Sequence, residues 1–88
     1  MTRDDIAAKL TEVLVTEFRV PKEKVTPEAT FRGNLGLDSL DATDLVFLLC
    51  KQFGLKPDLH SFRDLHTVQK CVDHLFAEVS KREAGGTR

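Results

Sequence analysis

The 88-residue chain contains no tryptophan and no tyrosine, and its formal net charge is only −1. Nucleic-acid binding is therefore disfavoured, because such proteins need a basic face and, for single strands, aromatic stacking surfaces. Long apolar runs are also missing, so no segment is expected to span a membrane. The first residues, Met1–Asp5, lack the apolar core of a signal peptide, which favours a cytoplasmic location.

Cysteine is scarce as well, with only Cys50 and Cys71, and each falls inside a predicted helix. Reduced thiols that fill space are the expectation for a cytoplasmic protein. Cys71 and His74 are three residues apart on one predicted helix, but His60 and His66 lack the paired spacing of metal ligands. The sequence therefore predicts no metal site.

Apolar side chains recur at helical spacing in three stretches, which predict helices over about 3–18, over 39–53 and from 68 onwards. Each stretch follows a residue suited to an N-cap, namely Thr2, Asp38 or Thr67. The stripes expected to be buried are Ile6, Leu10, Val13 and Leu14 in the first helix; Ala42, Leu45, Val46, Leu49 and Phe53 in the second; and Val68, Cys71, Val72, Leu75, Phe76 and Val79 in the last.

The connection from residue 19 to 38 contains two prolines and two glycines, which rule out a continuous helix. Its apolar residues are spaced through it and predict a loop that packs across the core: Val20, Val25, Phe31, Leu35 and Leu37. A short helical turn is expected at about 60–64, and 84–88 are predicted to form a flexible C-terminal tail after a domain of residues 1–83. The fold class predicted is all-α, a small antiparallel bundle of three long helices and one short helix with a long first loop.

Ser39 begins the second predicted helix directly after Asp38. With Asp38 as the cap, Ser39 is the first residue inside the helix, and its hydroxyl is expected to be free and to point outward. A serine in this place can also be a mere helix-start residue. No G-x-S-x-G elbow surrounds it and no histidine is evidently paired with it, so the sequence does not indicate an enzyme. A phosphate ester on Ser39 would lie beside unpaired backbone N–H groups.

The outer face of the same helix carries Leu40 and Phe47, one heptad apart and opposite the buried stripe. Large apolar side chains in that place suggest a partner surface. Asp38, Asp41 and Asp44 form an acidic rim that suits basic partners and also favours the positive end of the helix dipole. A helical interaction module that is never modified would explain the same surface.

The motif Leu35-Gly36-Leu37-Asp38-Ser39-Leu40-Asp41-Ala42-Thr43-Asp44-Leu45 resembles the attachment site of acyl carrier proteins. Thr26-Pro27, Ala29-Thr30-Phe31 and Thr67-Val68-Gln69 extend the resemblance, which covers about Ile6 to Glu78.

The resemblance implies that a phosphopantetheinyl transferase, which supplies magnesium and the base, transfers 4′-phosphopantetheine from coenzyme A to Ser39. The arm then carries acyl groups as thioesters to enzymes of fatty-acid, lipid or polyketide-type synthesis, and the core would expand to shelter the acyl chain. Asp38 would assist recognition by the transferase, whereas Leu40, Asp41, Asp44 and Phe47 would face partner enzymes with basic docking patches.

Some residues depart from the fatty-acid-synthesis pattern. Cys50-Lys51-Gln52 stands where those carriers have glutamates, the segment Gly54–Leu59 lacks their acidic run, and Phe47 is larger than expected. These differences predict a specialised carrier. The length of the chain favours a stand-alone protein, and its small, charged surface favours a monomer. A peptidyl or aminoacyl carrier is the alternative within the class.

Overall fold

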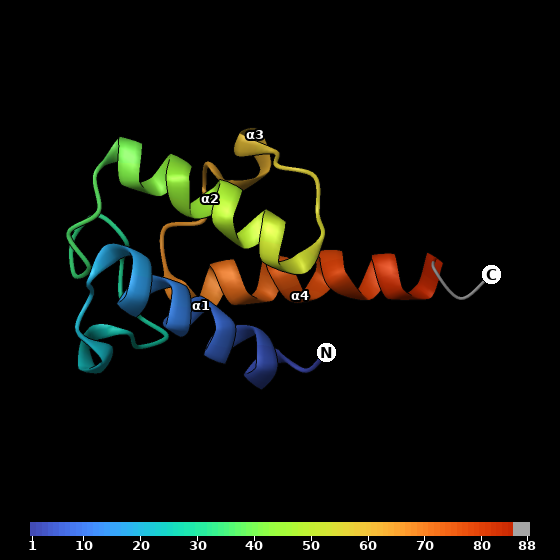
Figure 1. The fold of residues 1–88 in the computed structure, drawn as a ribbon, viewed down its shortest axis with the longest axis horizontal. Helices are drawn as coiled ribbons and strands as arrows, with labels where there is room; N and C mark the ends of the chain where they lie inside the picture. The colour runs from blue at the N-terminus through green and yellow to red at the C-terminus, as the bar shows by residue number, and fades with distance from the viewer. Residues whose placement is uncertain (86–88) are drawn as a thin grey trace.

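The computed structural model describes residues 1–85 and is all-helical there, as predicted. It comprises α1 (Arg3–Phe18), a short 3₁₀ helix η1 (Lys22–Lys24), α2 (Ser39–Phe53), α3 (Leu59–Phe62) and α4 (Val68–Gly85). Helix α1 runs antiparallel to both α2 and α4 (Figure 1). The 3₁₀ turn was not predicted, and α3 begins one residue earlier than expected because Asp58 caps it.

The core lies where the apolar stripes of α1, α2 and α4 meet. Ile6, Leu10, Leu49 and Leu75 are fully buried, and the rest of the predicted stripes are buried too, with two exceptions. Ala42 is half-buried because it lies on the wall of an open cavity. Phe76 is half-buried because it packs at the surface beneath the guanidinium of Arg3, which lies 4.3 Å from the ring centroid.

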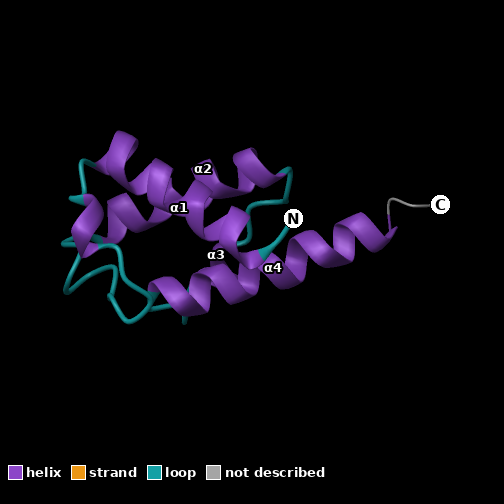
Figure 2. Cartoon of the chain, turned by 90° about the horizontal axis from the view of Figure 1, so that it is seen from below, coloured by secondary structure: helices purple, strands orange, loops and turns teal. Residues whose placement is uncertain are grey.

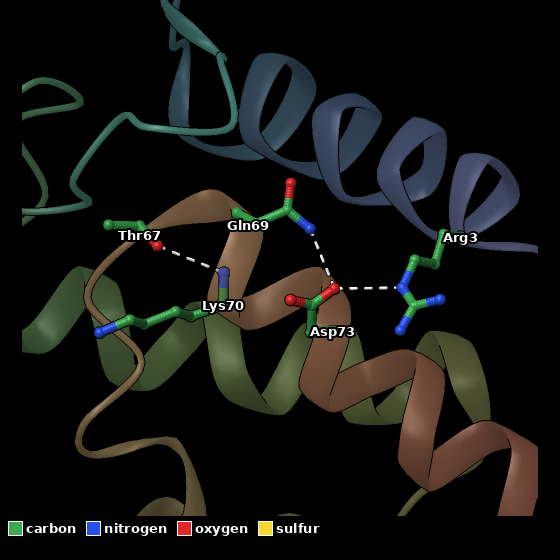
Figure 3. Close-up of polar contacts among 5 residues, drawn as sticks. All are labelled: Arg3, Thr67, Gln69, Lys70 and Asp73. Atoms are coloured by element: carbon green, nitrogen blue, oxygen red, sulfur yellow. Dashed lines mark hydrogen bonds and ion pairs between the residues drawn. The ribbon is translucent and has the colours of Figure 1, made fainter.

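The helix starts follow the predicted caps. Thr2 and Asp5 form a capping box at α1, and Asp38 and Asp41 form one at α2. At α4 the Thr67 hydroxyl accepts a hydrogen bond from the backbone N–H of Lys70 at 3.2 Å (Figure 3). These local bonds satisfy N–H groups that have no partner inside their helices, so the sequence fixes each start.

The long first loop packs across the core, as predicted. Val20, Phe31, Leu35 and Leu37 are buried, and Val25 is half-buried against the core. Backbone hydrogen bonds attach the loop to the residues that precede and begin α4. The N–H groups of Phe31, Val68 and Gln69 donate to the carbonyls of His66, Ala29 and Pro27 over 2.9–3.0 Å. The loop is therefore a structural layer of the domain.

A polar contact joins the first turn of α1 to α4. Arg3 Nε and Gln69 Nε2 both donate to the same oxygen of Asp73, at 3.1 and 2.9 Å (Figure 3). Arg3 and Asp73 are about half-exposed, so water and salt screen the pair and its contribution is at most about 1 kcal/mol. Apolar packing of α1 against α4 therefore supplies most of the stabilisation.

The C-terminal part of α4 projects beyond the other helices (Figure 2). Helix α4 reaches Gly85, two residues past the expected domain boundary at 83. The rest of the predicted tail, 86–88, lies outside the described residues. Within residues 1–85, no helix is both long and apolar enough to cross a membrane.

Candidate functional site

Ser39 is the first residue of α2 and is exposed. The adjacent cap does not use its hydroxyl, because the Asp38 carboxylate accepts the N–H of Asp41 at 2.8 Å and the Asp41 carboxylate accepts the N–H of Asp38 at 3.4 Å. The N–H groups of Ser39 and Leu40 have no partner inside the helix at this position. The site thus combines an accessible hydroxyl with the positive end of a 15-residue helix.

The expectation that the Ser39 hydroxyl is free was wrong. Arg32 Nη2 donates a hydrogen bond to Ser39 Oγ at 3.3 Å. The loop folds back between the two residues, with the N–H of Leu37 donating to the carbonyl of Phe31 at 2.8 Å and Gly36 adopting a left-handed φ of 68°. A cation seven residues before the serine, with two glycines between, was the only sequence signal for this contact.

A cavity of about 750 Å³ opens beside Ser39, between α2, α3 and the loop that precedes α2. Arg32 and Ser39 lie on its wall, and the buried side chains of Leu49 and Cys71 also line it. The wall is largely apolar and the volume falls within the range of ordinary ligand pockets. Helix α3 contributes Leu59 and Phe62 to this cavity, a role that the sequence did not predict.

The outer face of α2 is exposed as predicted. Leu40 is 77% exposed and Phe47 is 48% exposed. Asp38 and Asp44 are exposed beside them, while Asp41 is half-buried through its capping interaction. The predicted acidic rim and apolar strip are therefore both on the surface next to Ser39.

The described contact of the Ser39 hydroxyl does not supply a general base. Its hydrogen-bond partner, Arg32, is a permanent cation that cannot take up the hydroxyl proton. His60 and His66 line the cavity, and His74 packs edge-on against Phe62 with 4.9 Å between ring centroids. No group of three or more potential metal ligands occurs within residues 1–85.

The two thiols are buried and free. Burial raises the pKa of Cys50, and it raises the pKa of Cys71 to about 12, with a smaller contribution from the charge of Cys50. Because the thiolate is the reactive form, neither cysteine is activated for chemistry. They fill space in the interior, as predicted from their positions in α2 and α4.

The chain is similar to known proteins in sequence and in fold. A family model described as "Phosphopantetheine attachment site" matches residues 8–75. The chain is 35% identical over 75 residues to the acyl carrier protein of Rubrobacter xylanophilus, covering 85% of this chain and 93% of that protein. Its fold is similar to that of the acyl carrier protein from Enterococcus faecalis, with a TM-score of 0.72, 23% identity, and coverage of 88% and 98% of the two chains.

The family model and the curated relative define the class of the protein, a carrier of covalently attached groups. The chain belongs to the acyl carrier protein family. Its cofactor is 4′-phosphopantetheine, attached covalently, and its work involves interaction with partner enzymes. The residues present fit this group, because an exposed hydroxyl, a helix N-terminus and a cation converge at Ser39 beside an apolar cavity.

Proposed function

We propose that Ser39 is the residue to which 4′-phosphopantetheine is attached, and that the protein delivers acyl groups, held as thioesters on that arm, to the enzymes of a biosynthetic pathway. One observation carries the proposal: Asp38 and Asp41 cap α2 by themselves, and the Ser39 hydroxyl stays exposed at the edge of the cavity. A serine needed only for capping would not leave its hydroxyl outside the capping bonds.

The helix start provides the electrostatics for the attached phosphate. The N–H groups of Ser39 and Leu40 have no acceptor within α2, and the helix dipole favours negative charge at this end. The terminal thiol of the arm supplies the thioester. An apolar acyl chain would find shelter in the cavity whose wall includes Leu49 and Phe62. Each part of the cargo thus has an environment of matching polarity.

Leu40 and Phe47, together with Asp38, Asp41 and Asp44, form the docking surface in this proposal. The exposed apolar pair would enter a partner's pocket, while the carboxylates would meet basic side chains. A phosphopantetheinyl transferase is the first such partner and the acyl-processing enzymes follow. The proposal includes a monomeric carrier located in the cytoplasm.

The test is the intact mass before and after incubation with coenzyme A, Mg²⁺ and a broad-specificity phosphopantetheinyl transferase. The native protein should gain one phosphopantetheine and Ser39→Ala should gain none. Ser61→Ala is the matched control, because Ser61 is also exposed but hydrogen-bonds to Asp58, and it should be modified normally. A folded native protein with no gain in mass would instead support the unmodified interaction module.

The acyl pathway is a specialised one in this proposal, because Lys51 and Gln52 end the acidic rim and Phe47 broadens the apolar strip. The modified protein should turn over more slowly with the ketosynthase of fatty-acid synthesis than a carrier from that pathway does. Equal turnover would contradict specialisation. Efficient loading by an amino-acid-activating enzyme would instead indicate a peptidyl or aminoacyl carrier.

A further inference from the structure

Arg32 is an exposed cation that contacts the proposed attachment residue. Its guanidinium donates to Ser39 Oγ at 3.3 Å, and both residues lie on the wall of the cavity. The nearby carboxylates of Asp38 and Asp41 are engaged with each other's backbone. Within the described part of the chain, Arg32 forms no ion pair, so its charge is available for another anion.

Hydrogen bonds fix the backbone on both sides of Arg32. Phe31 is buried, its N–H donates to the carbonyl of His66 at 3.0 Å, and its own carbonyl accepts the N–H of Leu37. On the other side, the Thr30 hydroxyl accepts the N–H groups of Gly33 and Asn34 at 3.2 and 3.1 Å. Since these bonds fix the loop, only the side-chain torsions of Arg32 need to adapt to a ligand.

We propose that Arg32 is a positioning residue for the phosphodiester that joins the arm to Ser39. This inference rests on the proposed function. A phosphodiester at Ser39 places two non-bridging oxygens, which share one negative charge, two bonds from Oγ. A guanidinium that already reaches Oγ reaches these oxygens by small torsional changes and can bind both through its planar fork.

The consequence is a preferred direction for the arm. In this proposal Arg32 binds the phosphate from the loop that precedes α2. The backbone N–H groups of Ser39 and Leu40 face the same phosphate from the first turn of the helix. With the phosphate held between them at the cavity edge, the arm leaves along the cavity wall. The pairing is exposed to solvent, so salt weakens it and partner enzymes can compete with it.

The test is the ³¹P NMR spectrum of the phosphopantetheine-bearing protein, folded and in urea, for the native chain, Arg32→Met, Arg32→Lys and Arg63→Met. Arg63 also lines the cavity but has no hydrogen bond to Ser39, so its variant is the matched control. The Arg32→Met protein should lose more than half of the folded-minus-unfolded shift difference. Arg32→Lys should retain part of it and Arg63→Met all of it. Added salt should reduce the difference in the proteins that keep a cation at residue 32 and should change it least in Arg32→Met.

Circular dichroism of the unmodified variants should match that of the native protein, because Arg32 is exposed. Intact mass measures modification independently of the ³¹P shift, so the two proposals can be tested separately. A native protein that gains no mass would overturn both the attachment at Ser39 and the role of Arg32. Full modification with the same ³¹P shift difference in Arg32→Met as in the native chain would overturn the role of Arg32 alone. If Arg32→Met is modified poorly, the ³¹P shift difference of Arg32→Lys is compared with that of the native chain instead.

Discussion

Asp38 and Asp41 cap α2 reciprocally: each carboxylate accepts the backbone N–H of the other residue, over 2.8 and 3.4 Å. This arrangement gives the two aspartates a structural role that is independent of any partner. It also leaves Ser39, which lies between them, outside the capping bonds. A substitution at either aspartate therefore changes both helix stability and surface charge, and the two effects need separate variants.

Asp38→Ala and Asp38→Asn separate capping from recognition. Asp38→Ala should lower the free energy of unfolding by about 1 kcal/mol, whereas Asp38→Asn should be close to native because asparagine caps as well as aspartate. Both variants lose the charge proposed to meet the transferase, so both should show a lower kcat/KM for modification. Urea unfolding and initial modification rates measure the two quantities. Native modification rates in Asp38→Asn would show that Asp38 is a cap alone.

Leu40→Ser and Phe47→Ser should affect docking and leave folding intact. Leu40 is mostly exposed and Phe47 is about half-exposed, so the free energy of unfolding should fall by no more than about 0.5 kcal/mol in Leu40→Ser and by about 1 kcal/mol in Phe47→Ser. Each should raise the KM of the transferase by about fivefold, equivalent to about 1 kcal/mol of lost contact energy. Gln52→Ser, an exposed change on the same helix, is the control for KM.

Leu49→Ala is the contrasting change on α2. Its side chain is 0% exposed and contributes to both the core and the cavity wall, so the free energy of unfolding should fall by about 2–5 kcal/mol. Urea unfolding measures the loss. A stability equal to that of Leu40→Ser would contradict the burial of Leu49 in the interior.

Acid should weaken the cap that holds the start of α3. Hydrogen bonds from the Ser61 hydroxyl and from the backbone N–H groups of Ser61 and His60 lower the pKa of Asp58 below its ordinary 3.8. Because the folded pKa lies below the unfolded one, this stabilisation is present above pH 3.8 and is lost as the pH falls through the folded value.

Amide exchange across Leu59–Phe62 should therefore accelerate as the pH falls below 3.8, beyond the intrinsic effect of pH on exchange. Asp58→Asn keeps an acceptor for the backbone N–H groups but cannot titrate, so it should remove this pH dependence. If the native helix shows the same pH profile as Asp58→Asn, the carboxylate does not control α3.

The Cys71 thiol should be unreactive in the folded protein. Burial raises its pKa from 9.0 to about 12, so at pH 9 the folded thiol is almost fully protonated while the unfolded thiol is half ionised. Alkylation by iodoacetamide, followed by peptide mass mapping, should be much slower in buffer than in urea. Equal rates would contradict the buried position.

The raised pKa of Cys71 should also lower the stability of the fold at alkaline pH. Above pH 9 the unfolded state releases the Cys71 proton and the folded state retains it, so stability falls as the pH rises from 9 towards 12. Urea midpoints across that range measure the loss. Cys71→Ala should lower the midpoint at pH 8 through lost packing but show a weaker decline at high pH.

Much of the fold could be predicted because its signals are local. The caps Thr2, Asp38 and Thr67 bond to residues three positions ahead, so they are readable from a short window of sequence. The buried stripes follow from helical periodicity, and only Ala42 and Phe76 departed from them. Ala42 lies on an open cavity and Phe76 lies beneath the Arg3 guanidinium. Other segments of the chain create both environments, so the sequence of the residue's own helix does not reveal them.

The sequence by itself determined where the helices begin, which faces are buried, and that an exposed serine follows a self-sufficient cap. Only the tertiary structure decided what surrounds that serine. The Arg32–Ser39 contact depends on a loop that hydrogen-bonds to His66, more than thirty residues away in the chain. The cavity depends on how α3 packs against α2. Local spacing specifies elements, whereas a site that several segments share forms only when long-range packing brings them together.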